Sequence, residues 1–326
     1  MRVLILGGSG FVGRAVADEA VRRGAEVTVF NRGRRPAPDG VTALAGDRLA
    51  DDGLDALRAG KWDAVVDTWS GAGTAVGRTA ALLSGRAGWY GYVSSRSVYA
   101  DDAGPHAAED APLVDAAEAG YAGDKLRGEI ATEVFGGPVL LGRAGLILGP
   151  GEDVGRLPWW LNRLARGGPT LAPGPQDLPL QYVDARDLAA FLLDAGEQRL
   201  GGPYNLVSES GHTTMGELLE VAGEVTGGRA QLRWTDPAVI LAAGIEPWTQ
   251  LPVWLPPGSQ DYDLLHRGDT SKARAAGLVC RPVRETVADT WAWLMSLPGE
   301  APLRADRSSK GLDPAVEAKV LADQFG

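Results

Sequence analysis

Three glycines near the N-terminus constrain this chain more than any other feature. Gly7, Gly10 and Gly13 lie directly after the apolar run 3–6 and directly before a helical pattern that begins at Phe11. In such a unit the first glycine permits a sharp turn, the second lets main chain approach a pyrophosphate, and the third lets helix and strand pack closely. The helix N-terminus adds unbonded N–H groups and the positive end of a dipole. This context predicts a dinucleotide-binding loop with the contact residues Gly7, Gly10, Phe11, Val12 and Gly13.

Short apolar runs alternate with helical patterns over the first half of the chain. Strands are expected at 3–6, 26–30, 41–45, 63–67, 88–93 and 139–142, and helices at 11–23 and 121–135. Strands that are apolar throughout and alternate with helices form parallel sheets covered on both faces. The fold class predicted is therefore α/β, with a doubly wound parallel sheet of the Rossmann type.

The character of the sequence changes after Gly149-Pro150-Gly151, where proline, glycine and tryptophan become frequent. Residues 181–184 and 185–195 then read as a strand and a helix that return to the first domain. We expect an NAD(P)-binding Rossmann domain at 1–150 plus about 181–200. A smaller α/β substrate-binding domain is expected at about 151–180 and 201–326, with helices at 214–226, 283–297 and 312–325.

Charge and composition limit the cellular location and the binding partners that we expect. The chain has 326 residues, a net charge of −10 and one cysteine, Cys280. An acidic protein is poorly suited to nucleic acid, which needs a basic face. A single cysteine permits no internal disulfide and fits a cytoplasmic location. No apolar run approaches the length of a membrane span, and no targeting segment is recognised, so we expect a soluble protein that does not bind membranes.

The end of the second expected strand bears on the choice of cofactor. An NAD site usually has an acidic residue there for the adenosine ribose, whereas this chain has Asn31 and then Arg32. Without the carboxylate a 2′-phosphate is not repelled, and a guanidinium can bind it with two hydrogen bonds. NADP is therefore favoured, with NAD as the alternative. Asp47, after the third strand, could bond the adenine amino group or cap the next turn.

Tyr121 and Lys125 are spaced to share one face of a helix. A free tyrosine with a pKa of about 10 is a poor base at neutral pH, but a nearby ammonium stabilises the phenolate. Such a pair can exchange a proton with a substrate oxygen while hydride moves to or from a nicotinamide. A serine at the end of the fifth strand could hydrogen-bond the same oxygen. The glycine loop, the strand-end serine and the helix pair occur in this order along the chain.

The chain resembles the short-chain dehydrogenase/reductase superfamily, in its extended or atypical, epimerase/dehydratase-like group. The resemblance covers nearly the whole chain and rests on GGSGFVG at 7–13, VSSRSVYA at 93–100, YAGDK at 121–125, GRAGLILGPG at 142–151, QYVDARDLA at 181–189 and DTSKARAAGL at 269–278. It implies that Ser95, Tyr121 and Lys125 are the catalytic residues, with Tyr121 as the acid/base. Lys125 would also hold the nicotinamide ribose, and main chain near Gly145 would meet the nicotinamide end. Relatives commonly pair through the Tyr121 helix, which allows a homodimer here.

Two departures from these relatives limit the substrate. Sugar-nucleotide dehydratases carry Asp-Glu just after the catalytic hydroxyl residue, where this chain has Arg96 and Ser97. A dehydratase of that type is therefore not expected. Sugar-nucleotide epimerases commonly have an asparagine near the position of Leu146, and its absence weakens a sugar-nucleotide substrate without excluding it.

The second domain should select the substrate. Four of its tryptophans could wall a pocket for an apolar or ring-containing ligand, although core packing is their more ordinary role: Trp159, Trp160, Trp248 and Trp254. Arg156, His106 and His212 are candidates for polar contacts but more ordinary as solvated loop residues. The chain's three histidines are His106, His212 and His266. Their spacing matches no metal-ligand motif, and no metal is predicted.

These observations favour an enzyme, an NADP(H)-dependent oxidoreductase that acts on a carbonyl or alcohol of a small metabolite. A sugar-nucleotide or related epimerase with tightly bound NAD is the first alternative. A non-catalytic nucleotide-binding protein is the second, because Asn31-Arg32-Gly33 and Asp67-Thr68-Trp69 are similar to segments of atypical members, some of which are described as RNA-binding.

Overall fold

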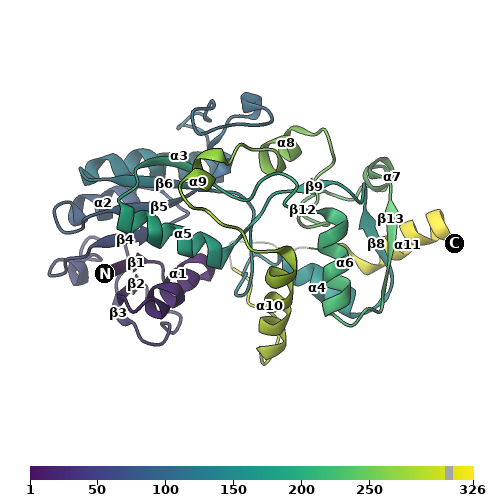
Figure 1. Cartoon of the computed structure of the whole chain (residues 1–326), viewed down its shortest axis with the longest axis horizontal. Helices are drawn as coiled ribbons and strands as arrows, with labels where there is room; N and C mark the ends of the chain where they lie inside the picture. Colours follow the sequence, from purple (N-terminus) through teal and green to yellow (C-terminus); the bar gives the residue numbers. More distant parts are fainter. Residues whose placement is uncertain (305–310) are drawn as a thin grey trace. The chain divides into compact units, whose positions relative to one another are not determined.

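Seven parallel strands form the central sheet of the computed structural model, which describes residues 1–304 and 311–326 (Figure 1). Their order across the sheet is β11-β6-β5-β4-β1-β2-β3. The strands are β1 (Arg2–Leu6), β2 (Glu26–Asn31), β3 (Thr42–Ala45), β4 (Ala64–Asp67), β5 (Tyr90–Ser95), β6 (Val139–Ala144) and β11 (Gly202–Leu206). The chain runs outward from β1 to β3 and then returns to β4 on the other side of β1. Open sheets of this kind bind ligands beside the carboxyl ends of the strands at such a reversal.

Helices cover both faces of this sheet. Helix α1 (Phe11–Arg22) packs against α5 (Ala185–Gln198), and α2 (Gly73–Leu83) packs against α3 (Tyr121–Ala131). In β4, Val65 lies in one apolar cluster with Val76 of α2, whereas Ala64 lies against Gly196 of α5. Because successive side chains of a strand point to opposite faces, the two helix pairs cover opposite faces. The predicted doubly wound α/β fold is confirmed.

The chain divides into two compact units, and each is described by itself. The first contains Met1–Gly145, Ala185–Val207 and Gly268–Cys280, and the second Leu146–Asp184, Ser208–Arg267 and Arg281–Gly326. These borders differ from the expected ones. Residues 183–184 pair with β7 (Ile147–Leu148) rather than with the central sheet. Strand β11 completes that sheet, and Asn205 donates a hydrogen bond to the carbonyl of Asp269 at 2.8 Å, which joins 268–280 to the first unit.

The second unit is built from short sheets and helices around one apolar core. Its strands are β7, β8 (Gly168–Pro173), β9 (Pro179–Leu180), β10 (Val183–Asp184), β12 (Thr213–Thr214) and β13 (Ala230–Thr235). Its helices are α4 (Arg156–Ala165), α6 (Met215–Val225), α7 (Pro237–Ala242), α8 (Gln260–His266), α10 (Val283–Ser296) and α11 (Pro314–Phe325), while α9 (Ser271–Ala275) belongs to the first unit. No described helix is both long and apolar enough to span a membrane.

Two of the four candidate pocket tryptophans are core residues. Trp160 and Trp254 are fully buried, and their indole N–H groups donate to the carbonyls of Pro252 at 2.6 Å and Gly174 at 3.1 Å. Trp159 and Trp248 are partly buried and pack against the same core. Trp160 and Trp254 therefore have the more ordinary of the two expected roles, which is core packing.

Two elements of the first unit have no strong sequence signal. Helix α2 contains two glycines and is held mainly by the buried face of Val76, Ala80 and Leu83. Strand β11 begins Gly202-Pro203, a pair that usually argues against a strand. As the last strand of the sheet it needs to pair on one side only, so the proline is tolerated.

Glu152 is fully buried at the start of α4 and accepts hydrogen bonds from the main-chain N–H groups of Arg156 at 2.7 Å and Leu157 at 3.1 Å. Burial raises the pKa of this carboxyl to about 7, although the Arg156 charge and the two amides oppose the shift. In the unfolded chain the pKa is near 4.5. The folded state thus binds the proton more tightly, so stability from this group is full below pH 4.5 and is lost as pH rises to 7.

Glu152→Gln should remove this loss, because the amide does not titrate. Between pH 4.5 and 7 the free energy of unfolding of the wild type should fall relative to that of the variant by roughly 3 kcal/mol. Urea unfolding of both proteins across this range measures the difference. Glu224→Gln, which changes an exposed carboxylate, serves as the control. Parallel pH curves for wild type and Glu152→Gln would contradict the assignment.

Candidate dinucleotide and catalytic site

The glycine loop connects β1 to α1 and leaves the first turn of the helix uncapped. Gly7 donates its N–H to the carbonyl of Phe30 in β2 at 2.9 Å, and Gly10 closes a turn onto Gly7 at 3.2 Å. The first N–H bonded within α1 is that of Arg14, to Gly10 at 2.7 Å. The N–H groups of the three preceding residues have no partner within the helix. They could bind the phosphates of a dinucleotide.

The loop glycines have different reasons to lack a side chain. A Cβ on Gly7 would strike the hydroxyl of Thr68, and a Cβ on Gly13 would strike the carbonyl oxygen of Gly7. At Gly10 a Cβ would meet only that carbonyl oxygen, at 3.8 Å. Packing therefore requires Gly7 and Gly13 to be glycine, whereas Gly10 leaves open the side from which a ligand could approach.

The carboxyl end of β2 carries an arginine-rich turn. Asn31 accepts a hydrogen bond from the N–H of Gly33 at 2.7 Å, and Gly33 has a positive φ of 69°. The turn leaves Arg32, Arg34 and Arg35 exposed. Asp47, after β3, accepts a hydrogen bond from the N–H of Leu49 at 3.0 Å and so holds a turn. The Asn31 side chain shapes the turn, and Arg32 is left accessible to a ligand.

Ser95, Tyr121 and Lys125 all belong to the first unit. Ser95 ends β5, is 7% exposed and exchanges hydrogen bonds with Ser97, whose N–H lies 3.1 Å from Ser95 Oγ. The short 3-10 turn that follows Ser95 packs against α3. Tyr121 is the first residue of α3 and is 40% exposed, whereas Lys125 is 3% exposed. The helix therefore begins with an accessible phenol above a buried ammonium.

Lys125 is held by main-chain oxygens. Its Nζ donates to the carbonyls of Trp69 at 2.6 Å and Val93 at 2.7 Å. The same atom lies 4.9 Å from the centroid of the Tyr92 ring and 5.9 Å from that of Tyr121. Ammonium groups are attracted to the faces of aromatic rings at such distances. The spacing expected from a shared helix face is therefore present, and the ammonium has a fixed position beside Tyr121.

Sequence reasoning missed a buried ionic network at the end of β4. Arg48 donates two hydrogen bonds to Asp67, at 2.6 and 2.7 Å, and the Tyr90 hydroxyl donates to the same carboxylate at 2.5 Å. Burial alone would raise the pKa of Asp67, but the Arg48 charge and the hydrogen bonds that the carboxylate accepts together hold that pKa below its usual value. The sequence feature that could have indicated this network is the carboxylate of Asp67 at the end of the otherwise apolar strand 64–67.

Gly145 follows β6 and lies against Val207, where a Cβ would come within 2.7 Å of a side-chain methyl. Nearby, Arg143 forms a buried ion pair with Glu129 at 2.9 Å and contacts the Tyr99 hydroxyl at 3.2 Å. That hydroxyl donates to Asn205 at 2.7 Å. The close approach explains the glycine, and the network links the end of β6 to α3 and β11.

Arg96, which departs from the dehydratase pattern, and Leu146, which departs from the epimerase pattern, are both buried. Arg96 is fully buried, and Gly268 packs so closely on its guanidinium that a Cβ would overlap it. Burial lowers the pKa of Arg96 to about 10. Leu146 is buried in the core of the second unit. Neither residue resembles the acid–base pair or the asparagine that it replaces.

The remaining polar candidates have different surroundings. His266 is fully buried, with its Nδ1 accepting the N–H of Gln181 at 3.1 Å, and His212 Nε2 contacts the carbonyl of Arg281 at 2.9 Å. Arg156 lies over the Trp248 ring, and His106 is exposed. Among the described residues no group of three metal-ligating side chains occurs.

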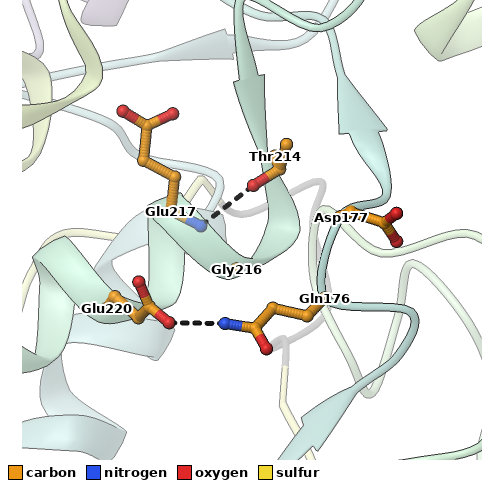
Figure 2. Close-up of a pocket in the computed structure, with 6 residues that line it drawn as sticks. All are labelled: Gln176, Asp177, Thr214, Gly216, Glu217 and Glu220. Atoms are coloured by element: carbon orange, nitrogen blue, oxygen red, sulfur yellow. Dashed lines mark hydrogen bonds between the residues drawn. The ribbon is translucent and has the colours of Figure 1, made fainter.

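A hollow of about 460 Å³ in the second unit lies beside the start of α6 (Figure 2). Its lining residues are Gln176, Asp177, Thr214, Gly216, Glu217 and Glu220. Gln176 donates to Glu220 at 2.6 Å, and Thr214 caps the helix by accepting the N–H of Glu217 at 3.1 Å. The three carboxylates make this hollow unsuitable for a phosphate-bearing ligand.

These features define the class of α/β proteins with a doubly wound, Rossmann-like sheet. The chain belongs to the NAD dependent epimerase/dehydratase family, whose sequence profile matches residues 3–206. This confirms the resemblance to the extended short-chain dehydrogenase/reductase group. A search of curated proteins finds no match.

Solved structures with the same fold include three that hold NAD. The Bordetella bronchiseptica enzyme WbmG, in complex with NAD and UDP, is 20% identical with a TM-score of 0.68, over 95% of this chain and 99% of that one. WbmH of the same organism, in complex with NAD+, is 18% identical with a TM-score of 0.67, over 91% and 99%. The Thermus thermophilus UDP-glucose 4-epimerase, in complex with NAD, is 20% identical with a TM-score of 0.64, over 89% and 99%. At these identities the likeness shows the fold.

Gly13→Ala should weaken dinucleotide binding, because the added methyl must displace the Gly7 carbonyl and with it the loop. Overpacking of this kind costs about 1–3 kcal/mol, so the affinity for NAD+ and NADP+ should fall about tenfold or more. Isothermal titration calorimetry measures the affinity for each of the two ligands. Gly223→Ala, in the helix interior of α6 with no atom near its Cβ, is the control and should bind like the wild type. Unchanged affinity in Gly13→Ala would exclude this loop as the binding site.

Proposed function

We propose that the protein is an NADP(H)-dependent oxidoreductase that transfers hydride to or from a carbonyl or alcohol of a small metabolite. The observation that carries this proposal is the arrangement of Tyr121 and Lys125, an accessible phenol beside a buried, positioned ammonium. A positive charge near a phenol stabilises its phenolate and so favours proton exchange near neutral pH. Membership of an NAD dependent family supports the cofactor class.

In this mechanism the chain's own residues bind the reacting oxygen and move its proton. Ser95 Oγ donates a hydrogen bond to the substrate oxygen and holds it near Tyr121 Oη. In the oxidative direction Tyr121 Oη takes the hydroxyl proton, and in the reductive direction it returns a proton to the carbonyl oxygen. Lys125 stabilises the phenolate in either direction. The nicotinamide, when bound, supplies the hydride acceptor or donor.

The residues that would hold the cofactor follow the carboxyl ends of β1, β3 and β6, except Lys125, which lies in α3. The amides of Phe11, Val12 and Gly13 would bind the pyrophosphate, and Asp47 lies at the end of β3, where it could face the adenine. Lys125 would contact the nicotinamide ribose, and main chain at Gly145 the nicotinamide end. The second unit would bind the substrate.

An epimerase with tightly bound NAD is a second candidate, because the family description and the NAD-bound structures of similar fold favour it. Such an enzyme would show no net redox change. Purified protein that carries NAD+ and turns over without added cofactor would support the epimerase. Turnover that consumes added NADPH or NADP+ stoichiometrically would support the oxidoreductase.

Tyr121→Phe should abolish most of the nicotinamide-linked turnover, because it removes the atom that exchanges the proton. General acid–base catalysis contributes about a hundredfold to ten-thousandfold, so kcat should fall by about that factor. The affinity for cofactor should remain within about twofold, because the helix position of Lys125 does not change. Absorbance at the nicotinamide band with a panel of carbonyl compounds measures turnover. Retained kcat in Tyr121→Phe would contradict the proposed role.

Arg32→Ala tests the preference for NADP. Hydrogen bonds to a charged partner contribute about 1.5–3 kcal/mol, so the affinity for NADP+ should fall about tenfold or more. The affinity for NAD+, which lacks the 2′-phosphate, should not change. Arg58→Ala alters another exposed arginine, paired with Asp55, and serves as the control. Equal losses for NADP+ and NAD+, or none for NADP+, would remove the basis for NADP selectivity.

A further inference from the structure

A single residue, Trp69, connects Lys125 to the buried network at the end of β4. The carbonyl of Trp69 accepts the Lys125 ammonium at 2.6 Å and the Tyr92 hydroxyl at 3.2 Å. The N–H of Trp69 donates to Asp67 Oδ1 at 3.0 Å. Its indole N–H donates to the carbonyl of Ala72 at 3.0 Å. The position of the ammonium therefore depends on how firmly this residue is held.

Arg48 contacts both the Asp67 carboxylate, which accepts the Trp69 N–H, and the ring of Trp69 itself. Besides its two bonds to Asp67, its guanidinium contacts the Thr79 hydroxyl at 3.0 Å and the carbonyl of Ala75 at 3.0 Å, both in α2. The guanidinium carbon also lies 5.1 Å from the centroid of the Trp69 ring. Asp67 is 0% and Arg48 5% exposed, so water does not compete for these bonds.

Thr68, between Asp67 and Trp69 in the sequence, contacts the dinucleotide loop. Thr68 donates its N–H and its hydroxyl to the carbonyl of Leu6, at 3.1 and 2.9 Å. The Thr68 hydroxyl also occupies the space that a side chain on Gly7 would need. The segment 67–69 is therefore in contact with the glycine loop on one side and with Lys125 on the other.

We propose that Arg48 and Asp67 are positioning residues, which fix the Trp69 carbonyl and through it place the Lys125 ammonium beside Tyr121. This inference rests on the proposed function, in which Lys125 supports proton exchange at Tyr121. Neither Arg48 nor Asp67 touches the reacting atoms. Their effect reaches the site through two consecutive hydrogen bonds, Asp67 to Trp69 and Trp69 to Lys125.

Stability alone is a weak explanation for this pair. Removing two charges from water costs several kcal/mol per ion, and an apolar pair of similar volume often stabilises a core equally well. An apolar pair could not accept the Trp69 N–H, which would leave a part-buried donor without this acceptor. The ionic pair instead supplies an acceptor for the Trp69 N–H, Asp67 Oδ1, whose position is fixed by Arg48.

Asp67→Asn tests the proposal, with Tyr90→Phe as a milder variant that keeps both charges and removes only the 2.5 Å bond to Asp67. Glu317→Gln is the matched control: it neutralises the buried carboxylate paired with Arg163 at 2.7 Å in the second unit, outside the contacts of Lys125. The first measurement is the acylation rate of Lys125 by acetic anhydride, followed by peptide mass spectrometry on folded protein without cofactor. The second is the pH dependence of kcat for alcohol oxidation.

In Asp67→Asn, an amide NH2 replaces one carboxylate oxygen and cannot accept the hydrogen bonds of Arg48 and Tyr90, so Trp69 is held less firmly. The acylation rate of Lys125 should therefore rise about tenfold, the change expected when one hydrogen bond is lost. The midpoint of the acid limb of kcat should move up by about one pH unit, because a less fixed ammonium stabilises the Tyr121 phenolate less. Tyr90→Phe should shift both quantities in the same direction by smaller amounts. Glu317→Gln should shift neither, although it should lower the thermal stability.

Folded Asp67→Asn with a wild-type acylation rate and a wild-type pH midpoint would overturn the proposal. If Asp67→Asn does not fold, Tyr90→Phe decides, and an unchanged acylation rate in that variant overturns it. Equal changes in Glu317→Gln would also overturn it, because they would reflect general loosening. The acylation rate requires no turnover, so it decides this inference even if the wild type shows no nicotinamide-linked activity, which would instead refute the proposed function.

Discussion

All seven strands of the central sheet run in the same direction, so every loop that follows a strand leaves from the same edge. This constraint brings together residues that are far apart in the sequence. Gly7 follows β1, Ser95 ends β5, and Gly145 follows β6, while Trp69 follows β4. Helix α3 then packs beside β5 and adds Tyr121 and Lys125 to that edge. The site is thus a consequence of sheet direction and strand order.

The parts of this site that the sequence predicts are those encoded by neighbouring residues. The glycine loop is one continuous heptapeptide, and Tyr121 and Lys125 are separated by one helical turn. Both depend on local geometry, which residue spacing reports directly. Six of the seven strands of the central sheet are recognisable for the same reason, since each is a short apolar run bounded by polar or glycine residues, whereas β11 begins Gly202-Pro203 and is not.

The parts that the sequence does not predict depend on contacts between distant segments. Arg48 and Asp67 are 19 residues apart and come from a loop and a strand that only the sheet order makes adjacent. Helix α2 lacks a strong pattern, and its buried face, including Ala80, packs in an apolar cluster with residues of several sheet strands. In the second unit, Trp160 and Trp254 are buried in the core, and their indole N–H groups are accepted by carbonyls of residues remote in sequence, Pro252 and Gly174. No periodicity within the sequence encodes these partners.

The charges around Lys125 are arranged so that its own charge remains effective. The carbonyls of Trp69 and Val93 hold the ammonium through dipoles and do not neutralise it. Asp67 lies only one hydrogen bond beyond Trp69, and an unpaired carboxylate there would oppose a phenolate at Tyr121. Arg48 matches that negative charge with two hydrogen bonds. The pair therefore provides the rigid acceptor that Trp69 needs without adding net charge, and the positive field at Tyr121 comes from Lys125.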